Sequence, residues 1–351
     1  MNDEVRLGFV GLGRWGPNHV RVFEALPGCR VTRLADPDPA RLREARRLFP
    51  NGAISSEPAE VLEDPAIDAV VIASPSVTHA PLAAVALQAG KDVLCEKPLA
   101  LSASDARRLI ELAERGERVL MVSHVFLYNA GIRALRGYVR EGRLGHVQYL
   151  YATRTNLGPI RTDVNAAWDL ASHDLGIFGY LLGQAPHEVS AQGARILSDL
   201  QEDVAFLTLR YPDGVLAHAH VSWLDPRKVR QITVVGTRQM AVWDDLDNVA
   251  PIRLFDKGVS PPEGAVNFGE FRFLTREGDV LLPRIDLEEP LKVQNRHFLE
   301  CIRERRRPLT DGRNGLEVVR QLEAVDRSLA AHGAPVAIQP RTQLHAAGRS
   351  A

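Results

Sequence analysis

The sequence has few cysteines, no long hydrophobic run and almost no net charge. Its three cysteines among 351 residues show no CxxC spacing, which gives no sign of a disulfide framework or a zinc site. The 43 basic and 44 acidic residues leave a net charge of −1, so no global field attracts nucleic acid or anionic lipid. No apolar run approaches the roughly 18 residues of a membrane span, and the acidic start MNDEVRLGFVGLG is unlike a signal peptide. We therefore expect a two-domain cytoplasmic protein with no nucleic-acid partner, membrane partner or bound metal.

The first third of the chain alternates short apolar runs with helical patterns. Strands that are apolar throughout and separated by helices are typical of a parallel sheet covered on both faces. Right-handed crossovers then predict a doubly wound α/β domain of the Rossmann type over residues 1–125. The expected strands are residues 5–10, 30–35, 69–73, 92–95 and 119–123, and the expected helices are residues 18–25, 39–49, 79–89 and 102–115.

The pattern changes after residue 125, where strand-like runs follow one another with little helix between them. Residues 126–351 are therefore expected to form an α+β domain with a mostly antiparallel sheet. Pro212-Asp213-Gly214 supplies good hairpin chemistry between two of the strands. The expected strands are residues 146–155, 204–211, 215–223, 229–235 and 241–244, residues 255–282 alternate in the same way, and the expected helices are residues 129–141, 168–182, 291–306 and 315–332.

A glycine-rich turn follows the first expected strand. The run Gly11-Leu12-Gly13-Arg14-Trp15-Gly16 is a GxGxxG motif between a strand and a helix, the context that dinucleotide binding requires. Asp36 lies 20 residues beyond, where a carboxylate can accept hydrogen bonds from the adenosine ribose and repel a 2′-phosphate. This favours NAD, although the basic Arg33 and Arg41 keep NADP as the alternative. The candidate cofactor contacts here are Gly11, Gly13, Arg14, Trp15, Gly16 and Asp36.

A second signal is Glu96-Lys97-Pro98, directly after a short buried strand. Ligands of open α/β sheets sit outside the carboxyl ends of the strands, so Glu96 and Lys97 are placed to meet a cofactor. The Lys97 ammonium can also donate to an oxygen that gains negative charge during hydride loss. An ordinary charged surface loop is the competing interpretation.

The segments GFVGLGRWGPNH, VVIASPSVTHAPLAAVALQAGKDVLCEKPLA and HFLECIRERRRPLTDGRNGLEVVRQLEAVDRSL together resemble the Gfo/Idh/MocA oxidoreductase family. The resemblance covers nearly the whole chain and implies a Rossmann domain followed by a domain with a large open antiparallel sheet. It further implies a homodimer or homotetramer formed through that sheet, and a cis peptide at Lys97–Pro98 that aims Lys97 at the nicotinamide. Ser74, Pro75 and His79 match the loop that lies along the cofactor in the family.

A third motif, Asp169-Leu170-Ala171-Ser172-His173, opens an expected helix. Residues four apart share a helix face, so Asp169 and His173 pair a base with a carboxylate on a rigid element. Alone, a capped helix with an exposed histidine is the simpler interpretation. The resemblance implies instead that Lys97, Asp169 and His173 form the catalytic group, with His173 as general base, Lys97 stabilising the substrate oxygen and Asp169 binding substrate.

The run Asn165-Ala166-Ala167-Trp168 replaces the glycine-rich run common in the family. The surrounding RTNLGPIRTDVNAAWDLASHDLGIFGYLLG is similar to the subgroup that includes nucleotide-sugar 3-dehydrogenases, which oxidise UDP-N-acetylglucosamine at C3. A guanidinium such as that of Arg161 matches phosphate oxygens, although it is equally a candidate for a solvated loop charge. The candidate substrate contacts are His124, Tyr128, Asn129, Asn156, Arg161 and Asn165; Tyr128 is equally a candidate for interdomain packing.

The sequence thus predicts an NAD-dependent oxidoreductase acting on a sugar secondary alcohol, with C3 of a nucleotide sugar as the first choice. Inositol or simple-sugar dehydrogenases and NAD-using glycosidases are the alternatives within the resemblance. The alternative outside the enzymes is a regulator that binds the cofactor without catalysing a reaction. Two other signals are set aside: His218 and His220 as a metal site, and the basic run at residues 303–307 as a nucleic-acid contact, since cations are also favoured at a helix carboxyl end.

Overall fold

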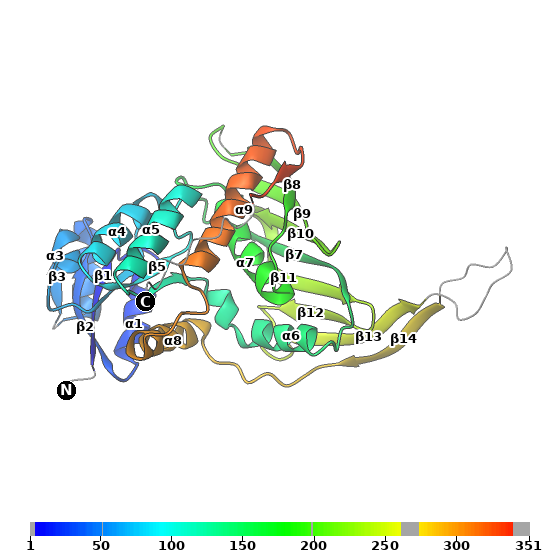
Figure 1. Ribbon diagram of the computed structural model, residues 1–351, viewed down its shortest axis with the longest axis horizontal. Helices are drawn as coiled ribbons and strands as arrows, with labels where there is room; N and C mark the ends of the chain where they lie inside the picture. The colour runs from blue at the N-terminus through cyan, green and yellow to red at the C-terminus, as the bar shows by residue number, and fades with distance from the viewer. Residues whose placement is uncertain (1–3, 51, 198, 261–273, 340–351) are drawn as a thin grey trace, which may run out of the picture.

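The computed structural model describes residues 4–50, 52–197, 199–260 and 274–339, which form two sheets side by side with helices on and between them (Figure 1). Within these ranges one sheet has six strands and the other has nine. No helix in the same ranges combines the length and the apolar character needed to cross a membrane.

The six-stranded sheet is parallel and has the order β3-β2-β1-β4-β5-β6. The central strands β1 and β4 and their neighbour β5 are almost entirely buried, because helices cover both faces of the sheet. The strands are β1 (Val5–Val10), β2 (Cys29–Ala35), β3 (Ala53–Ser55), β4 (Ala69–Ile72), β5 (Asp92–Glu96) and β6 (Leu120–Ser123). The helices of this part are α1 (Gly16–Glu24), α2 (Pro39–Leu48), α3 (Ala59–Leu62), α4 (His79–Gln88) and α5 (Ala103–Arg115), with a 3₁₀ turn η1 (Ser76–Thr78).

The nine-stranded sheet has the order β14-β13-β12-β11-β7-β10-β9-β8-β15. All its neighbours are antiparallel except β7 and β10. Its strands are β7 (Val147–Leu157), β8 (Glu188–Ala194), β9 (Val204–Arg210), β10 (Leu216–Ser222), β11 (Leu224–Gly236), β12 (Met240–Asp244), β13 (Ile252–Ser260), β14 (Leu274–Leu281) and β15 (Val336–Ala337). The other helical segments are η2 (Val125–Tyr128), α6 (Ala130–Arg140), η3 (Ala167–Ala171), α7 (Ser172–Leu182), α8 (Pro290–Glu304) and α9 (Gly312–Ala330).

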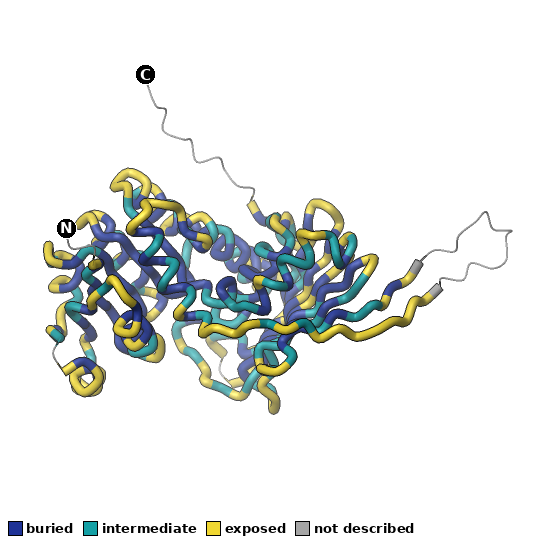
Figure 2. The backbone as a smooth tube through the Cα atoms, turned by 90° about the horizontal axis from the view of Figure 1, so that it is seen from below, coloured by how far each residue is buried: buried dark blue, intermediate teal, exposed yellow. Residues whose placement is uncertain are grey.

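The last two long helices join the two parts of the molecule. Helix α8 packs beside α1, where the rings of Phe23 and Phe298 meet edge to face with centroids 6.5 Å apart. Helix α9 runs between α5 and the large sheet, and Glu323 accepts a hydrogen bond from the backbone N–H of Ala103 at 2.8 Å (Figure 1). Figure 2 shows the buried backbone concentrated inside both sheets, while most of β14 is exposed at the far end of the molecule.

The expected fold classes are confirmed for both parts of the chain. Strands β3, β8 and β15 and helix α3 were not among the expected elements, and the expected helix over residues 168–182 begins with a π-helical turn at Ala167–Ala171. Part of the alternating segment, residues 261–273, lies outside the described residues. The domain boundary at residue 125 stays a prediction.

Candidate active site

The glycine-rich turn lies against the loop after β4. Gly11 has φ +96°, and a Cβ on it would lie 2.4 Å from the backbone nitrogen of Ser74, so only glycine fits there. A Cβ on Gly16 would lie 2.2 Å from the carbonyl oxygen of Gly11, so this position also requires glycine for the turn itself. A Cβ on Gly13 meets nothing closer than 3.5 Å, the Arg41 guanidinium. Packing therefore explains two of the three glycines, and Gly13 is left as the position where a ligand can approach the backbone.

Asp36 is buried at the end of β2 and faces this turn. One carboxylate oxygen accepts the backbone N–H of Leu12 at 2.7 Å, and the other accepts that of Asp38 at 2.9 Å. The Arg41 guanidinium lies 3.4 Å from the first oxygen. The first oxygen thus accepts from both Leu12 and Arg41, whereas the second accepts only from Asp38 among the described residues, so Asp36 is fixed in place with acceptor capacity left on one oxygen for a ribose hydroxyl. These features fit a bound NAD.

His79 connects the two loops that border the cofactor region. It opens α4, and its ring nitrogens lie 2.7 Å from the carbonyl oxygen of Pro98 and 2.9 Å from that of Ser74. Burial lowers the pKa of His79 below its ordinary value, although both carbonyl contacts oppose this. The peptide bond Lys97–Pro98 is cis, as the resemblance implied. His79 is thus placed between the two loops rather than beside an open space.

Glu96, at the end of β5, is part of a buried polar network. His19 contacts one of its oxygens at 3.0 Å, and the Ser123 hydroxyl donates to the same oxygen at 2.8 Å. Gln294 from α8 donates to Ser123 at 3.1 Å, and the other Glu96 oxygen accepts the N–H of Lys97 at 3.2 Å. Burial alone would raise the pKa of Glu96, but these partners lower it below its usual range. The network fixes the backbone from which Lys97 extends.

Lys97 and Asp169 meet where the two parts of the chain face each other. The Lys97 Nζ donates to the backbone oxygen of Asp169 at 2.5 Å and to its carboxylate at 3.2 Å. The same carboxylate oxygen lies 3.3 Å from the Arg161 guanidinium, and the other accepts the indole N–H of Trp223 at 3.1 Å. Burial alone would raise the pKa of Asp169, but the Lys97 and Arg161 charges and the Trp223 donor hold it below its usual value. Asp169 is therefore a fixed anion that orients Lys97.

The buried His124 and the partly buried His173 complete this group. Burial, together with the charges of Lys97 and Arg154, lowers the pKa of His173 well below its ordinary value. Burial and Lys97 lower the pKa of His124 to about 4. Among the described residues, Nδ1 of His173 and both ring nitrogens of His124 are buried with no hydrogen-bond partner. Both rings are therefore neutral near pH 7 and have nitrogens that a ligand or water can use.

The ring of His173 contacts an aromatic ring, which in turn contacts a buried ion pair. Its ring meets Phe126 edge to face, with centroids 4.9 Å apart. The Arg154 guanidinium lies 4.4 Å from the Phe126 centroid and donates to Asp174 at 2.8–3.1 Å. Arg154 and Asp174 are both almost fully buried, so this pair is held in one geometry.

The structure brings only some of the candidate substrate residues to this group. Arg161 binds Asp169 and also donates to Asp163 and Ser76, so most of its donors are already engaged. His124 lies within the electrostatic reach of Lys97. The Tyr128 hydroxyl pairs with Thr310 at 3.2 Å, so its contact with substrate stays a prediction.

The side chains of the three asparagines are engaged by other residues of the chain. Asn129 caps α6 and donates to Asp245 at 3.3 Å. Asn156, near the end of β7, donates to the carbonyl oxygen of Gly158 just after the strand. Asn165 donates to Glu202 and Asp326, both at 3.2 Å. Their contacts with substrate stay predictions.

Sequence reasoning missed Trp223 and the partners of Glu96. Trp223 follows β10 by one residue, and nothing in its local pattern indicates a contact with the distant Asp169. His19 is a residue with a possible signal, since it lies three positions after the glycine-rich motif on α1. Of the two strand histidines set aside, His220 stacks on Phe206 at 4.5 Å, and no group of three or more His, Cys, Asp or Glu in the described ranges is arranged to hold a metal ion.

Comparison with known families agrees with this geometry. A model described as "Oxidoreductase family, NAD-binding Rossmann fold" matches residues 5–124, and one described as "GFO/IDH/MocA C-terminal domain" matches residues 132–242. The chain belongs to the Gfo/Idh/MocA oxidoreductase family. The first of these models covers the glycine-rich turn and Lys97, and the second covers Asp169 and His173.

Relatives of this Gfo/Idh/MocA protein have more than one substrate. It is 28% identical to the myo-inositol 2-dehydrogenase of Thermotoga maritima over 60% of this chain and 66% of that protein. It is 28% identical to the UDP-N-acetylglucosamine 3-dehydrogenase of Acidithiobacillus ferrooxidans over 74% of this chain and 80% of that protein. The structure of GenD2 from gentamicin A biosynthesis in complex with NAD superposes with a TM-score of 0.80 at 25% identity, over 96% of this chain and 97% of that chain. The matches to the first curated relatives thus span just under two thirds of their length.

Proposed function

We propose that this protein is an NAD-dependent dehydrogenase that oxidises a secondary alcohol of a sugar, with C3 of a nucleotide sugar such as UDP-N-acetylglucosamine as the first-choice substrate. The observation that carries the proposal is the pairing of Lys97 with Asp169 beside the partly buried, neutral His173, next to a turn that fits NAD. A sensor that only binds cofactor has no need for this group.

The cofactor would lie along the glycine-rich turn, with Asp36 accepting the adenosine ribose hydroxyls and the exposed Trp15 beside it. Arg14 and the loop at Ser74–Pro75 complete the proposed contacts. When bound, NAD supplies the acceptor for the hydride that leaves the alcohol carbon.

The side chains divide the proton chemistry between them. His173 is neutral at physiological pH, so its imidazole can accept the proton of the substrate hydroxyl. The Lys97 ammonium, held by the Asp169 carbonyl and carboxylate, donates to the oxygen as it gains negative charge. Asp169 stays ionised because Lys97, Arg161 and Trp223 stabilise its charge. In the proposed scheme, His173 thus accepts the proton of the alcohol and Lys97 stabilises its oxygen, and neither step uses a metal ion.

The substrate class rests on two kinds of likeness. The loop before Asp169 and the Acidithiobacillus relative support a nucleotide sugar. The inositol dehydrogenase relatives support an inositol as the second candidate. Arg161 decides little between them, because its guanidinium is already bound by Asp163 and Asp169.

We further propose that copies of the chain associate through the large sheet. The side chains of four residues on the adjacent strands β7, β9 and β10 are apolar or aromatic and 38–45% exposed: Tyr149, Tyr151, Phe206 and Leu216. Tyr149 stands opposite Leu216 in the register and stacks with Tyr151, and Phe206 stacks on His220 farther along β10.

Reduced-nicotinamide absorbance with NAD and a sugar panel tests the function. The panel holds UDP-N-acetylglucosamine, other UDP- and dTDP-sugars, inositols and glucose, with a ketone trap to draw the reaction forward. We expect turnover confined to UDP-N-acetylglucosamine and lost in His173→Asn but not in His220→Asn, which removes a partly exposed histidine from the sheet. Turnover with inositol alone would replace the substrate, and NAD binding without turnover on any sugar would favour a regulator.

The pH profile gives a second test of the base. Because burial lowers the pKa of His173 well below 6.5, kcat/KM for oxidation should stay level on lowering the pH through 6.5 and fall only at more acidic pH. An acid limb centred at or above pH 6.5 would contradict the assignment of His173.

A further inference from the structure

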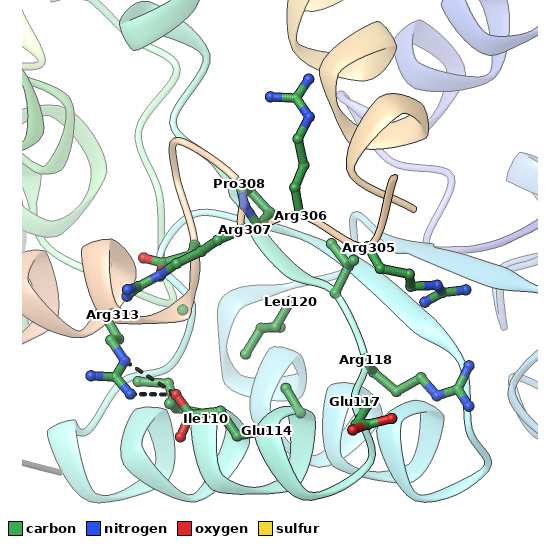
Figure 3. Close-up of a pocket in the computed structure, with 14 residues that line it drawn as sticks. Ile110, Glu114, Glu117, Arg118, Leu120, Arg305, Arg306, Arg307, Pro308 and Arg313 are labelled. Carbon is green, nitrogen blue, oxygen red and sulfur yellow. Dashed lines mark hydrogen bonds and ion pairs between the residues drawn. The ribbon is translucent and has the colours of Figure 1, made fainter. Parts of the chain in front are cut away.

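An arginine-rich cavity of about 750 Å³ lies at the amino end of β6 (Figure 3). It is bounded by the end of α5, the start of β6 and the segment between α8 and α9. Leu120, the first residue of β6, lines it, whereas Ser123 at the other end of the strand contacts Glu96. The cavity is therefore separate from the cofactor turn and from Lys97. Five arginines line it: Arg118, Arg305, Arg306, Arg307 and Arg313.

The lining carries an excess of positive charge. Its acidic residues are Glu114, Glu117 and Asp311. Apart from Arg306, whose side chain extends away from the cavity, four guanidinium groups accompany these three carboxylates. Two of these carboxylates bind arginines: Glu114 accepts from Arg313 at 2.5–3.1 Å, and Asp311 accepts from Arg307. The arginine side chains of these two pairs are 41% and 61% exposed, and such surface pairs contribute little stability, so an anionic ligand can compete for the guanidinium groups.

Arg118 and Arg305 provide donors on the other side of the cavity. Arg305 donates to the buried Asp92 at 2.9–3.1 Å through Nη1 alone. The Nε of Arg118 is buried and has no hydrogen-bond partner among the described residues. Figure 3 shows both side chains extending to one side, and Arg307 and Arg313 extending to the opposite side. Between them Leu120 and Ile110 offer apolar surface.

The segment that carries three of the arginines is anchored to β6. The N–H of Val122 donates to the carbonyl oxygen of Thr310 at 2.7 Å, and the Thr310 hydroxyl donates to the carbonyl oxygen of Val122 at 2.7 Å. This two-way contact fixes the backbone beside Arg307, so less conformational entropy is lost when a ligand binds.

From this arrangement we propose that the cavity is a binding site for a small molecule that carries a polyphosphate group. Guanidinium groups from both sides bind the phosphate oxygens, and the apolar surface at Leu120 and Ile110 accommodates a nucleobase where the ligand is a nucleotide. The volume lies within the range of about 300–1,000 Å³ typical of small-molecule sites. A nucleoside triphosphate and free inorganic polyphosphate share this chemistry, and the experiment separates them.

Isothermal titration calorimetry of the full chain saturated with NAD tests the proposal, since NAD fills the competing phosphate site at the glycine-rich turn. The probes are ATP, tripolyphosphate and adenosine. We expect ATP to bind. The double variant Arg118→Gln/Arg313→Gln should weaken ATP binding by about tenfold or more for each guanidinium removed. Arg307→Gln, a single change at a 61% exposed side chain, should weaken ATP about tenfold and does not endanger folding.

Arg306→Gln is the matched control. The Arg306 side chain extends away from the cavity and pairs with Glu300 and Glu304. Replacing it therefore removes the same charge as Arg307→Gln without removing a proposed contact. ATP binding stronger than tripolyphosphate supports a nucleotide, and equal binding supports polyphosphate as the ligand. The proposal is overturned if neither probe binds at millimolar concentration, if adenosine binds as well as ATP, or if Arg306→Gln weakens binding as much as Arg307→Gln.

Discussion

Exchanging Asp36 for asparagine should change which cofactor the protein prefers. The side chain keeps its size and one oxygen, which can still accept the N–H of Leu12. It loses its charge and its second acceptor oxygen, which in the wild type accepts the N–H of Asp38. The Arg41 guanidinium, 3.4 Å from the carboxylate, then loses its buried partner and is available to a 2′-phosphate.

The size of the effect follows from two terms. A hydrogen bond to a carboxylate contributes about 1.5–3 kcal/mol and one to a neutral amide about 1, so NAD binding should weaken by roughly 2- to 30-fold. A 2′-phosphate placed about 4–5 Å from a carboxylate is repelled by about 3–4 kcal/mol per unit charge at an effective dielectric constant of 20, and this repulsion disappears. The ratio of NAD to NADP affinity should therefore fall by at least about 100-fold.

Titration of both cofactors against wild type and variant measures this ratio, with the exposed Trp15 at the turn as a fluorescence reporter. Asp38→Asn is the matched control, because Asp38 carries the same charge beside the same Arg41, at 3.6 Å, but is the half-exposed cap of α2. The reasoning is refuted if Asp36→Asn leaves the ratio within threefold of wild type, or if the control lowers the ratio as much.

Three further results are expected. Lys97→Met should lower kcat by about 100- to 1,000-fold, the usual cost of losing a donor to a developing oxyanion, and NAD affinity by no more than a few-fold in titration; loss of NAD binding instead would contradict its role. As the pH falls from 6.5 toward 4, the free energy of unfolding should fall by up to about 3 kcal/mol on account of His124, because the pKa of His124 in the folded protein, about 4, lies below its unfolded value. In urea unfolding, the variant His124→Asn should lack this part of the pH dependence of the free energy of unfolding. Trp223→Phe should raise the pKa of Asp169, read from the pH dependence of its side-chain carboxyl NMR signal, whereas Trp243→Phe, whose indole N–H is buried with no partner among the described residues, should leave that pKa unchanged.

Much of the fold could be predicted from local pattern. The alternation of apolar runs with helical periodicity in the first third indicates a covered parallel sheet, because each element has to bury a face and the covered strands bury both. Short edge elements such as β3 and β15 carry too few residues to show any period, and their pairing is determined by the neighbouring strand.

The site shows the same division. Glycine-rich turns and charged motifs can be predicted from sequence because their function needs fixed spacing within one short segment. The contact of Trp223 with Asp169 joins residues 54 positions apart and depends on how β10 and the π-helical turn meet in space. The engagement of Arg161 by Asp163 is local, but the sequence alone does not say whether a neighbouring carboxylate or a ligand takes the guanidinium.

The contacts of Lys97 with Asp169 also have a mechanical meaning. Lys97 extends from the end of the Rossmann sheet, and Asp169 belongs to the helical turn that precedes α7 in the other part of the chain. Arg161 and Ser76 make a second cross-link a short distance away. The residues of the proposed catalytic group thus also connect the two parts of the chain. A movement that separated the two parts would break the contacts of Lys97 with Asp169, so the proposed catalytic group exists only while the two parts are in contact.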